Sequence, residues 1–170
     1  MRALVWIIED TWEATVAEAA AFLTSDADVT LLHVASTEAE TVAGAARRGL
    51  LGRHQPPRAA PALREISEQA AHELLAEAQT RLGRPARLEA RRGRVEHVVV
   101  AAAAPMDILV LARDGDRERL GPRSLGPTAR FVVDHAPCCV LLIWPDVAPA
   151  LTTIPPPPAP GAPQPRPSAL

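Results

Sequence analysis

Two hydrophobic periodicities divide the chain into short apolar runs and longer segments in which apolar residues recur every three or four positions. A short, nearly continuous apolar run is typical of a strand covered on both faces, whereas the longer period is typical of an amphipathic helix. The strands predicted in this way span residues 2–8, 29–34, 86–91, 107–112 and 138–144. Charged residues alternate with apolar ones in the third strand, so we expect it at a sheet edge with one wet face.

Helices are predicted between the strands, over residues 12–23, 63–82, 94–104 and 128–135, with a short further helix over 38–48. Asp10 and Glu13 have the spacing of a capping box, which makes Asp10 the expected N-cap of the first helix. Strands that alternate with helices form a parallel sheet with helices on both faces. We therefore predict an α/β fold, a three-layer sandwich around a five-stranded parallel sheet.

The predicted topology also indicates where a ligand would bind. In open parallel sheets, ligands occupy the crevice beyond the carboxyl ends of the strands, where the strand order reverses. The loops expected there span residues 9–11, 35–37 and 113–128. The last of these is polar and rich in Gly, Arg and Asp.

Proline separates a folded part from a tail. Ten of the 18 prolines lie at or beyond Pro145. Such a composition favours a polyproline-type conformation without a packed core, so we predict a domain over residues 1–145 and a disordered, solubilising tail over 146–170. The Gly- and Pro-rich connection over 35–61 is unusually long for a compact domain, which marks it as either functional or mobile.

Charge and cysteine content bear on the class of protein. The formal net charge is −2, whereas a dedicated nucleic-acid binder is usually basic. Arginines crowd residues 81–94 without interleaved aromatics to stack on bases, which favours a solvated surface over a nucleic-acid interface. Cys138 and Cys139 are the only cysteines and offer no disulfide framework, so we expect a cytoplasmic protein. No apolar run is long enough to span a bilayer, and we expect no membrane association.

A pattern in the last third of the domain is more specific. A strand over 107–112 precedes a Gly/Arg loop, then Leu-Gly-Pro-Thr-Ala-Arg from Leu125 and His-Ala-Pro-Cys-Cys-Val-Leu from His135. This pattern resembles the universal stress protein family, in which a Gly-x2-Gly-x9-Gly-Ser/Thr loop leads into a helix and a His-Ala-Pro-Cys-Pro-Val strand entry. The apolar start followed by Glu9, and the second strand ending in His33 and Val34, are also similar to the family.

The resemblance covers residues 2–144 as a single copy and implies an adenine nucleotide alpha hydrolase-like, Rossmann-like fold with the strand order 3-2-1-4-5. It implies a stress-response protein without turnover that binds ATP with Mg²⁺, or a related adenine nucleotide, at the carboxyl ends of the strands. Glycine amides and a helix N-terminus bind phosphate oxygens, and a hydroxyl adds a donor. The nucleotide-binding residues that the resemblance implies are Glu9, Val34, Arg113, Gly115, Gly126 and Thr128.

The loop departs from the family pattern in ways that bear on phosphate binding. Ala112 stands where the first glycine is expected, and the spacing from Gly115 to Gly126 is one residue longer. Pro122 and Pro127 lack amide donors. Three acidic residues bring negative charge to the place of the phosphates, opposed by four arginines; the acidic residues are Asp114, Asp116 and Glu118, and the arginines are Arg113, Arg117, Arg119 and Arg123.

These departures leave two hypotheses open. The protein is either a nucleotide-binding stress protein or an interaction module with a decayed loop that acts through dimerisation and partner binding. We predict no catalytic residue and no metal site, because no histidine has a His or Cys partner at metal-ligand spacing. His135 and Cys138 are interpreted as a helix C-terminal histidine and a core cysteine rather than as a thiolate pair.

The last predicted strand, from Cys138 to Trp144, is uncharged and would form an exposed edge in the predicted order. Such an edge aggregates unless it is covered. We expect a homodimer that pairs this strand with its own copy across a two-fold axis, which Leu142→Arg or Leu142→Pro would disrupt. The alternative cover is the proline-rich tail folding back over the same edge.

Overall fold

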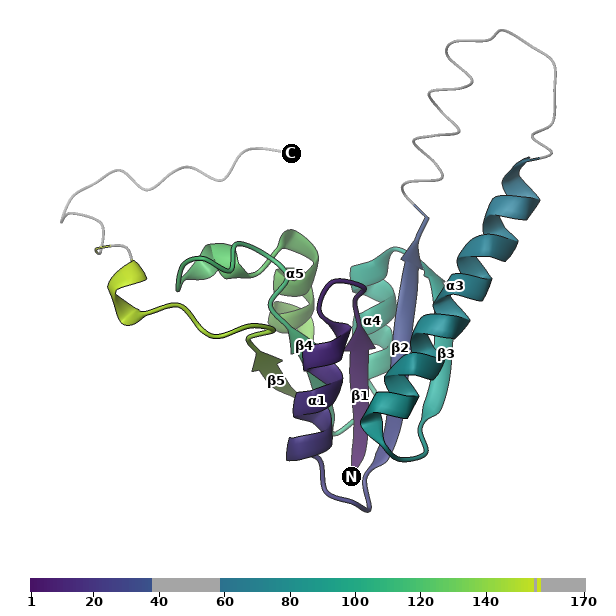
Figure 1. Ribbon diagram of the computed structural model, residues 1–170, viewed down its shortest axis with the longest axis horizontal. Coiled ribbons are helices and arrows are strands. Elements are labelled where there is room, and N and C mark those ends of the chain that lie inside the picture. Colours follow the sequence, from purple (N-terminus) through teal and green to yellow (C-terminus); the bar gives the residue numbers. More distant parts are fainter. Residues whose placement is uncertain (38–58, 155, 157–170) are drawn as a thin grey trace, which may run out of the picture.

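The computed structural model of the chain describes residues 1–37, 59–154 and 156. Its strands form one parallel sheet in the order β3-β2-β1-β4-β5, which confirms the predicted fold class and strand order (Figure 1). The strands are β1 (Arg2–Ile7), β2 (Asp28–Ser36), β3 (Arg87–Gly93), β4 (Ile108–Ala112) and β5 (Cys139–Ile143). The helix predicted over 38–48 lies outside the described residues.

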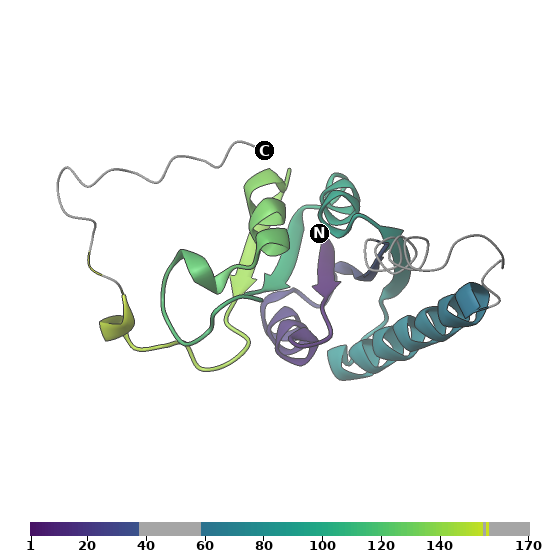
Figure 2. The same ribbon diagram turned by 90° about the horizontal axis from the view of Figure 1, so that it is seen from above.

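Helices cover both faces of the sheet and complete three layers. They are α1 (Trp12–Phe22), α3 (Ala59–Leu82), α4 (Val95–Ala103) and α5 (Pro127–His135), with single 3₁₀ turns η1 (Pro122–Ser124) and η2 (Leu151–Thr153). Figure 2 shows α1 and α3 on one face and α4 and α5 on the other. The helix boundaries agree with the predicted ones to within a few residues.

The apolar run at the start of the chain forms the central strand β1, which is covered by helices on both faces. Successive side chains of a strand point to opposite faces. Ala3, Val5 and Ile7 therefore belong to the core cluster under α1 and α3. Leu4 and Trp6 belong to the cluster under α4 and α5. One run of buried residues thus supplies both cores.

The edge strand β3 is less buried than its pattern predicts. Alternation predicted one wet and one dry face, but no residue of β3 is buried, and Leu88 is 39% exposed. An edge strand has a neighbour on one side only, so its apolar face is incompletely covered. The prediction of an edge position was correct, and the face that carries Leu88 is exposed as well as the predicted wet face.

The start of α1 also differs from the prediction. The N-cap is Thr11 rather than Asp10, and its side chain makes no capping hydrogen bond. The Thr11 amide donates to the Ile8 carbonyl oxygen at 3.0 Å, and the Thr15 hydroxyl donates to the Thr11 carbonyl oxygen at 2.8 Å. Asp10 therefore lies inside the turn that precedes the helix and cannot cap it.

Candidate functional site

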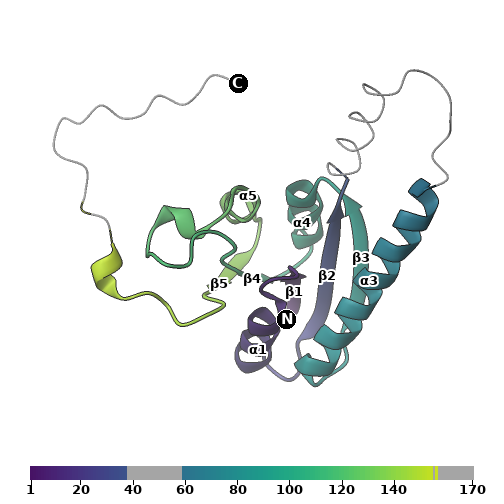
Figure 3. The same cartoon turned by 45° about the horizontal axis from the view of Figure 1, so that its top comes forward.

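The loop over residues 113–126, hereafter the 113–126 loop, lies beyond the carboxyl end of β4 and leads into α5 (Figure 3). Because the strands are parallel, the ends of β1 and β2 lie at the same edge of the sheet. Glu9 follows β1, and Val34 is near the end of β2. The fold therefore brings the sequence-predicted site residues to one end of the molecule.

Two of these residues have very different environments. Glu9 is exposed in the turn after β1. Val34 is only 7% exposed and packs in the core cluster under α4 and α5. The Val34 side chain therefore contributes to packing, whereas Glu9 is open to solvent.

The two arms of the 113–126 loop pair with each other. The Gly115 amide donates to the Ser124 carbonyl oxygen at 3.0 Å, and the Asp116 amide donates to the Arg123 carbonyl oxygen at 2.8 Å. A Cβ atom on Gly115 would lie 2.3 Å from the Arg123 carbonyl oxygen. Glycine is therefore required at position 115 by the close approach of the loop to itself.

The N-terminus of α5 is occupied by a side chain of the same loop. Gly126 is the N-cap of α5, and its amide donates to the Asp114 carboxylate at 2.7 Å. Pro127 follows at the first helical position and has no amide hydrogen. A helix N-terminus attracts anions, and here the anion is Asp114. We call three hydrogen bonds the closing bonds of the loop: Gly115–Ser124, Asp116–Arg123 and Gly126–Asp114.

Arg113, directly after β4, holds the loop through side-chain contacts. Its guanidinium group donates to the Ser124 hydroxyl and lies over the Trp144 ring, 4.8 Å from the ring centroid. Ser124 is fully buried and its hydroxyl donates to the Gly121 carbonyl oxygen at 2.6 Å. Burial lowers the pKa of Arg113, but an arginine remains charged at neutral pH. The guanidinium group is thus engaged by the protein itself.

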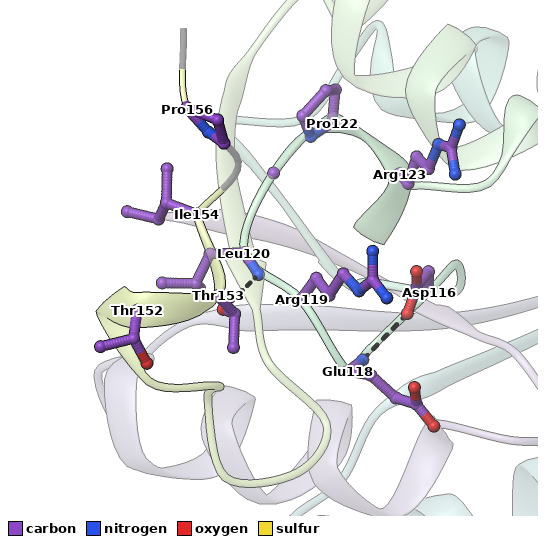
Figure 4. Close-up of a pocket in the computed structure, with 11 residues that line it drawn as sticks. Asp116, Glu118, Arg119, Leu120, Pro122, Arg123, Thr152, Thr153, Ile154 and Pro156 are labelled. Carbon is purple, nitrogen blue, oxygen red and sulfur yellow. Dashed lines mark hydrogen bonds between the residues drawn. The ribbon is translucent and has the colours of Figure 1, made fainter.

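The other loop residues are distributed around a groove. Thr128 is half-buried in the first turn of α5. Arg117 pairs with Asp146 at 3.2 Å. Arg119 and nearby loop residues form one side of a groove of about 750 Å³, and residues after β5 form the other side (Figure 4). The sequence patterns did not predict this groove, because its two sides are far apart in the chain.

The remaining candidate chemistry has structural explanations. His135 stacks on Phe131 with ring centroids 4.0 Å apart. Burial raises the pKa of the Cys138 thiol, so the thiol stays protonated at neutral pH. Among the described residues, no group of three His, Cys, Asp or Glu side chains is placed to hold a metal ion. Within the described ranges, no helix has the length and apolar character to cross a membrane.

The arginines over 81–94 are largely held by acceptors of the protein. Arg84 donates to the Thr24 carbonyl oxygen at 2.5 Å. The ion pairs are Arg91–Glu89 at 2.5 Å, Arg92–Glu68 at 3.7 Å and Arg94–Glu96 at 2.5 Å. These contacts favour the structural interpretation of the cluster.

The sequence did not predict the partners with which the loop residues interact. The negative charge of Asp114 was visible in the sequence, but its contact with an amide twelve residues later was not. The brace between Arg113 and Trp144 links the ends of two neighbouring strands. Contacts of this kind depend on the pairing of β4 with β5 and leave no local signal.

Both the sequence and the structure of this chain are similar to those of known proteins. The model of the universal stress protein family matches residues 6–143. No curated protein matches this chain in sequence. The hypothetical protein MJ0577 has a structure with 18% identity and a TM-score of 0.60, covering 84% of this chain and 94% of its own.

Two further solved structures have the same fold. A universal stress protein in complex with cAMP is 17% identical, with a TM-score of 0.56 over 86% of this chain and 98% of its own. A universal stress protein from Archaeoglobus fulgidus is 14% identical, with a TM-score of 0.51 over 84% of this chain and 98% of its own.

Proposed function

Because this chain belongs to the universal stress protein family, we propose that it is a non-catalytic stress-response protein whose 113–126 loop is closed by its own backbone and by the Asp114 side chain. The observation that carries this proposal is the Asp114 carboxylate on the Gly126 amide at the start of α5. Such a protein acts through contacts with other proteins and not through a bound nucleotide.

The closing bonds oppose a phosphate in two ways. A phosphate at the start of α5 must displace the Asp114 carboxylate, which carries the same sign of charge. It must also compete with the carbonyl groups that hold the amides of Gly115 and Asp116. At about 1 kcal/mol per bond, breaking three bonds costs roughly 3 kcal/mol, or about two orders of magnitude in affinity.

The second candidate function is binding of ATP with Mg²⁺, or of a related adenine nucleotide. The family relative in complex with cAMP supports it. In this alternative, the loop opens, Asp114 leaves the start of α5, and the nucleotide contacts the site residues named from the resemblance: Glu9, Val34, Arg113, Gly115, Gly126 and Thr128.

Thermal unfolding with and without millimolar Mg-ATP separates the two candidates. A ligand at 100 times its Kd adds about 2.7 kcal/mol to the stability of a folded protein. We expect no shift of the wild-type melting temperature. We expect a shift for the double variant Asp114→Ser/Pro127→Ser, because it removes the competing carboxylate and restores an amide donor at the start of α5.

The matched control is Asp134→Ser, which removes an exposed aspartate elsewhere on α5 and should leave the wild-type result unchanged. A clear wild-type shift with Mg-ATP would overturn the proposal in favour of the nucleotide-binding candidate. If neither protein shifts, the closing bonds are not what prevents binding, and that part of the proposal is wrong.

We further propose a cytoplasmic homodimer of domains that end near residue 145. β5 is the outer strand of the sheet, and its free edge carries half-buried apolar residues beside the exposed Cys139. A second copy of β5 would cover these residues and complete their backbone hydrogen bonds.

A further inference from the structure

Residues 145–154 follow β5 and lie beyond the segment that the family model matches. They run along the outer side of the 113–126 loop and form the 3₁₀ turn η2 beside it (Figures 3 and 4). We call residues 145–154 the strap.

Two polar contacts anchor the strap to the middle of the 113–126 loop. The Leu120 amide donates to the Thr153 hydroxyl at 3.1 Å, and that hydroxyl donates to the Ala150 carbonyl oxygen at 2.7 Å. The Arg117 guanidinium group pairs with the Asp146 carboxylate at 3.2 Å. Each contact joins one strap residue to the middle of the loop, between the residues that form the first two closing bonds.

The strap has little apolar contact with the domain. Its large apolar side chains are mostly exposed: Val147 is 94% exposed, Leu151 78% and Ile154, which lines the groove, 54%. The Arg117–Asp146 pair is also partly exposed, and exposed ion pairs contribute little. Hydrophobic burial therefore does not hold the strap, which depends on its polar contacts.

We propose that the strap is a releasable element that holds the 113–126 loop in its closed form. The proposal rests on the closed loop described under the proposed function. With the strap docked, Arg117 and Leu120 are fixed, so the amides of Gly115 and Asp116 stay against the opposite arm. With the strap released, Arg117 and Leu120 lose their anchors, so the closing bonds break more often. Asp114 then leaves the start of α5.

Amide hydrogen exchange tests this coupling residue by residue. The double variant Asp146→Asn/Thr153→Val removes both anchors and keeps the size of the side chains. We expect exchange about tenfold faster at the Leu120 amide and at the three amides of the closing bonds, as the loss of one or two hydrogen bonds allows. The control Thr152→Val alters a neighbouring hydroxyl that lines the groove but does not anchor the loop, and should exchange as the wild type does.

Two outcomes would contradict the proposed role of the strap. If exchange accelerates at Leu120 alone, the segment is docked but does not hold the loop. If nothing accelerates, the segment does not restrain the loop at all. Rapid exchange throughout a strand such as β1 would indicate global unfolding, and urea denaturation of the double variant distinguishes that case. The single variant Thr153→Val then repeats the exchange test in a less perturbed chain.

The experiments distinguish an error in the proposed role of the strap from an error in the proposed function. Binding of Mg-ATP by the wild-type protein contradicts the proposed function, whatever the exchange experiment shows. Unchanged exchange at the closing amides contradicts the strap, even when the wild type binds no nucleotide. If both proposals hold, the strap double variant gains a thermal shift with Mg-ATP that Thr152→Val does not.

Discussion

Gly115 and Gly126 are the two loop glycines that match the family pattern, and the structure gives each a local reason. A Cβ atom on Gly115 would meet the backbone of the opposite arm, whereas one on Gly126 would meet the Asp114 carboxylate at 3.0 Å. The first obstacle is backbone and the second is the end of a side chain. Glycines expected to admit a phosphate are therefore used by the loop to pack against itself.

Replacement of these glycines should have unequal effects. Gly115→Ala forces the arms apart, and we expect a loss of about 1–3 kcal/mol in the free energy of unfolding, as for an overpacked site. Gly126→Ala displaces only Asp114 and should cost less than about 1 kcal/mol. Urea denaturation measures both values. Equal losses would contradict the asymmetry of the two contacts.

At the scale of the elements, burial differs sharply between neighbouring strands. Leu31 of β2 and Leu88 of β3 are directly paired in register. Leu31 is fully buried between the helical layers, whereas Leu88 is 39% exposed at the edge. The same residue type in adjacent positions of one sheet therefore has two different energetic roles.

The matched pair Leu31→Ala and Leu88→Ala tests this difference. We expect Leu31→Ala to lower the free energy of unfolding by about 2–5 kcal/mol, because it leaves a cavity in the core. Leu88→Ala should cost about 1 kcal/mol or less. Chemical denaturation of both variants gives the comparison. A large loss for Leu88→Ala would mean that another surface covers β3 in solution.

At the scale of the whole molecule, β3 and β5 protect their free edges differently. β3 carries charged residues along its length, including the Arg91–Glu89 pair, whereas β5 is an uncharged apolar strand. Leu142 of β5 packs against the core cluster under α4 and α5, so a charge at that position would damage the fold as well as the edge. Cys139 is exposed on the same strand and avoids that ambiguity.

The proposed dimer should therefore be lost in Cys139→Arg, because each copy would bring a charged side chain to the apolar edge that pairs. Cys139→Ser is the matched control and should remain dimeric. Sedimentation at micromolar concentration measures the oligomeric state, and thermal unfolding confirms that both variants are folded. A monomeric wild type under these conditions would refute pairing through β5.

The sequence by itself determined the α/β class, the strand order and the end of the sheet where the candidate site lies. The class and the end of the sheet follow from periodicity and chain order, which are local properties of the sequence, whereas the strand order was implied by the resemblance of the sequence to the family. The tertiary structure decided what occupies that end. Asp114 reaches the amide of Gly126, and Thr153 reaches that of Leu120. The first contact requires the loop to fold back on itself, and the second requires residues beyond β5 to lie against the loop. No local pattern encodes such contacts, because only the folded sheet brings these segments together.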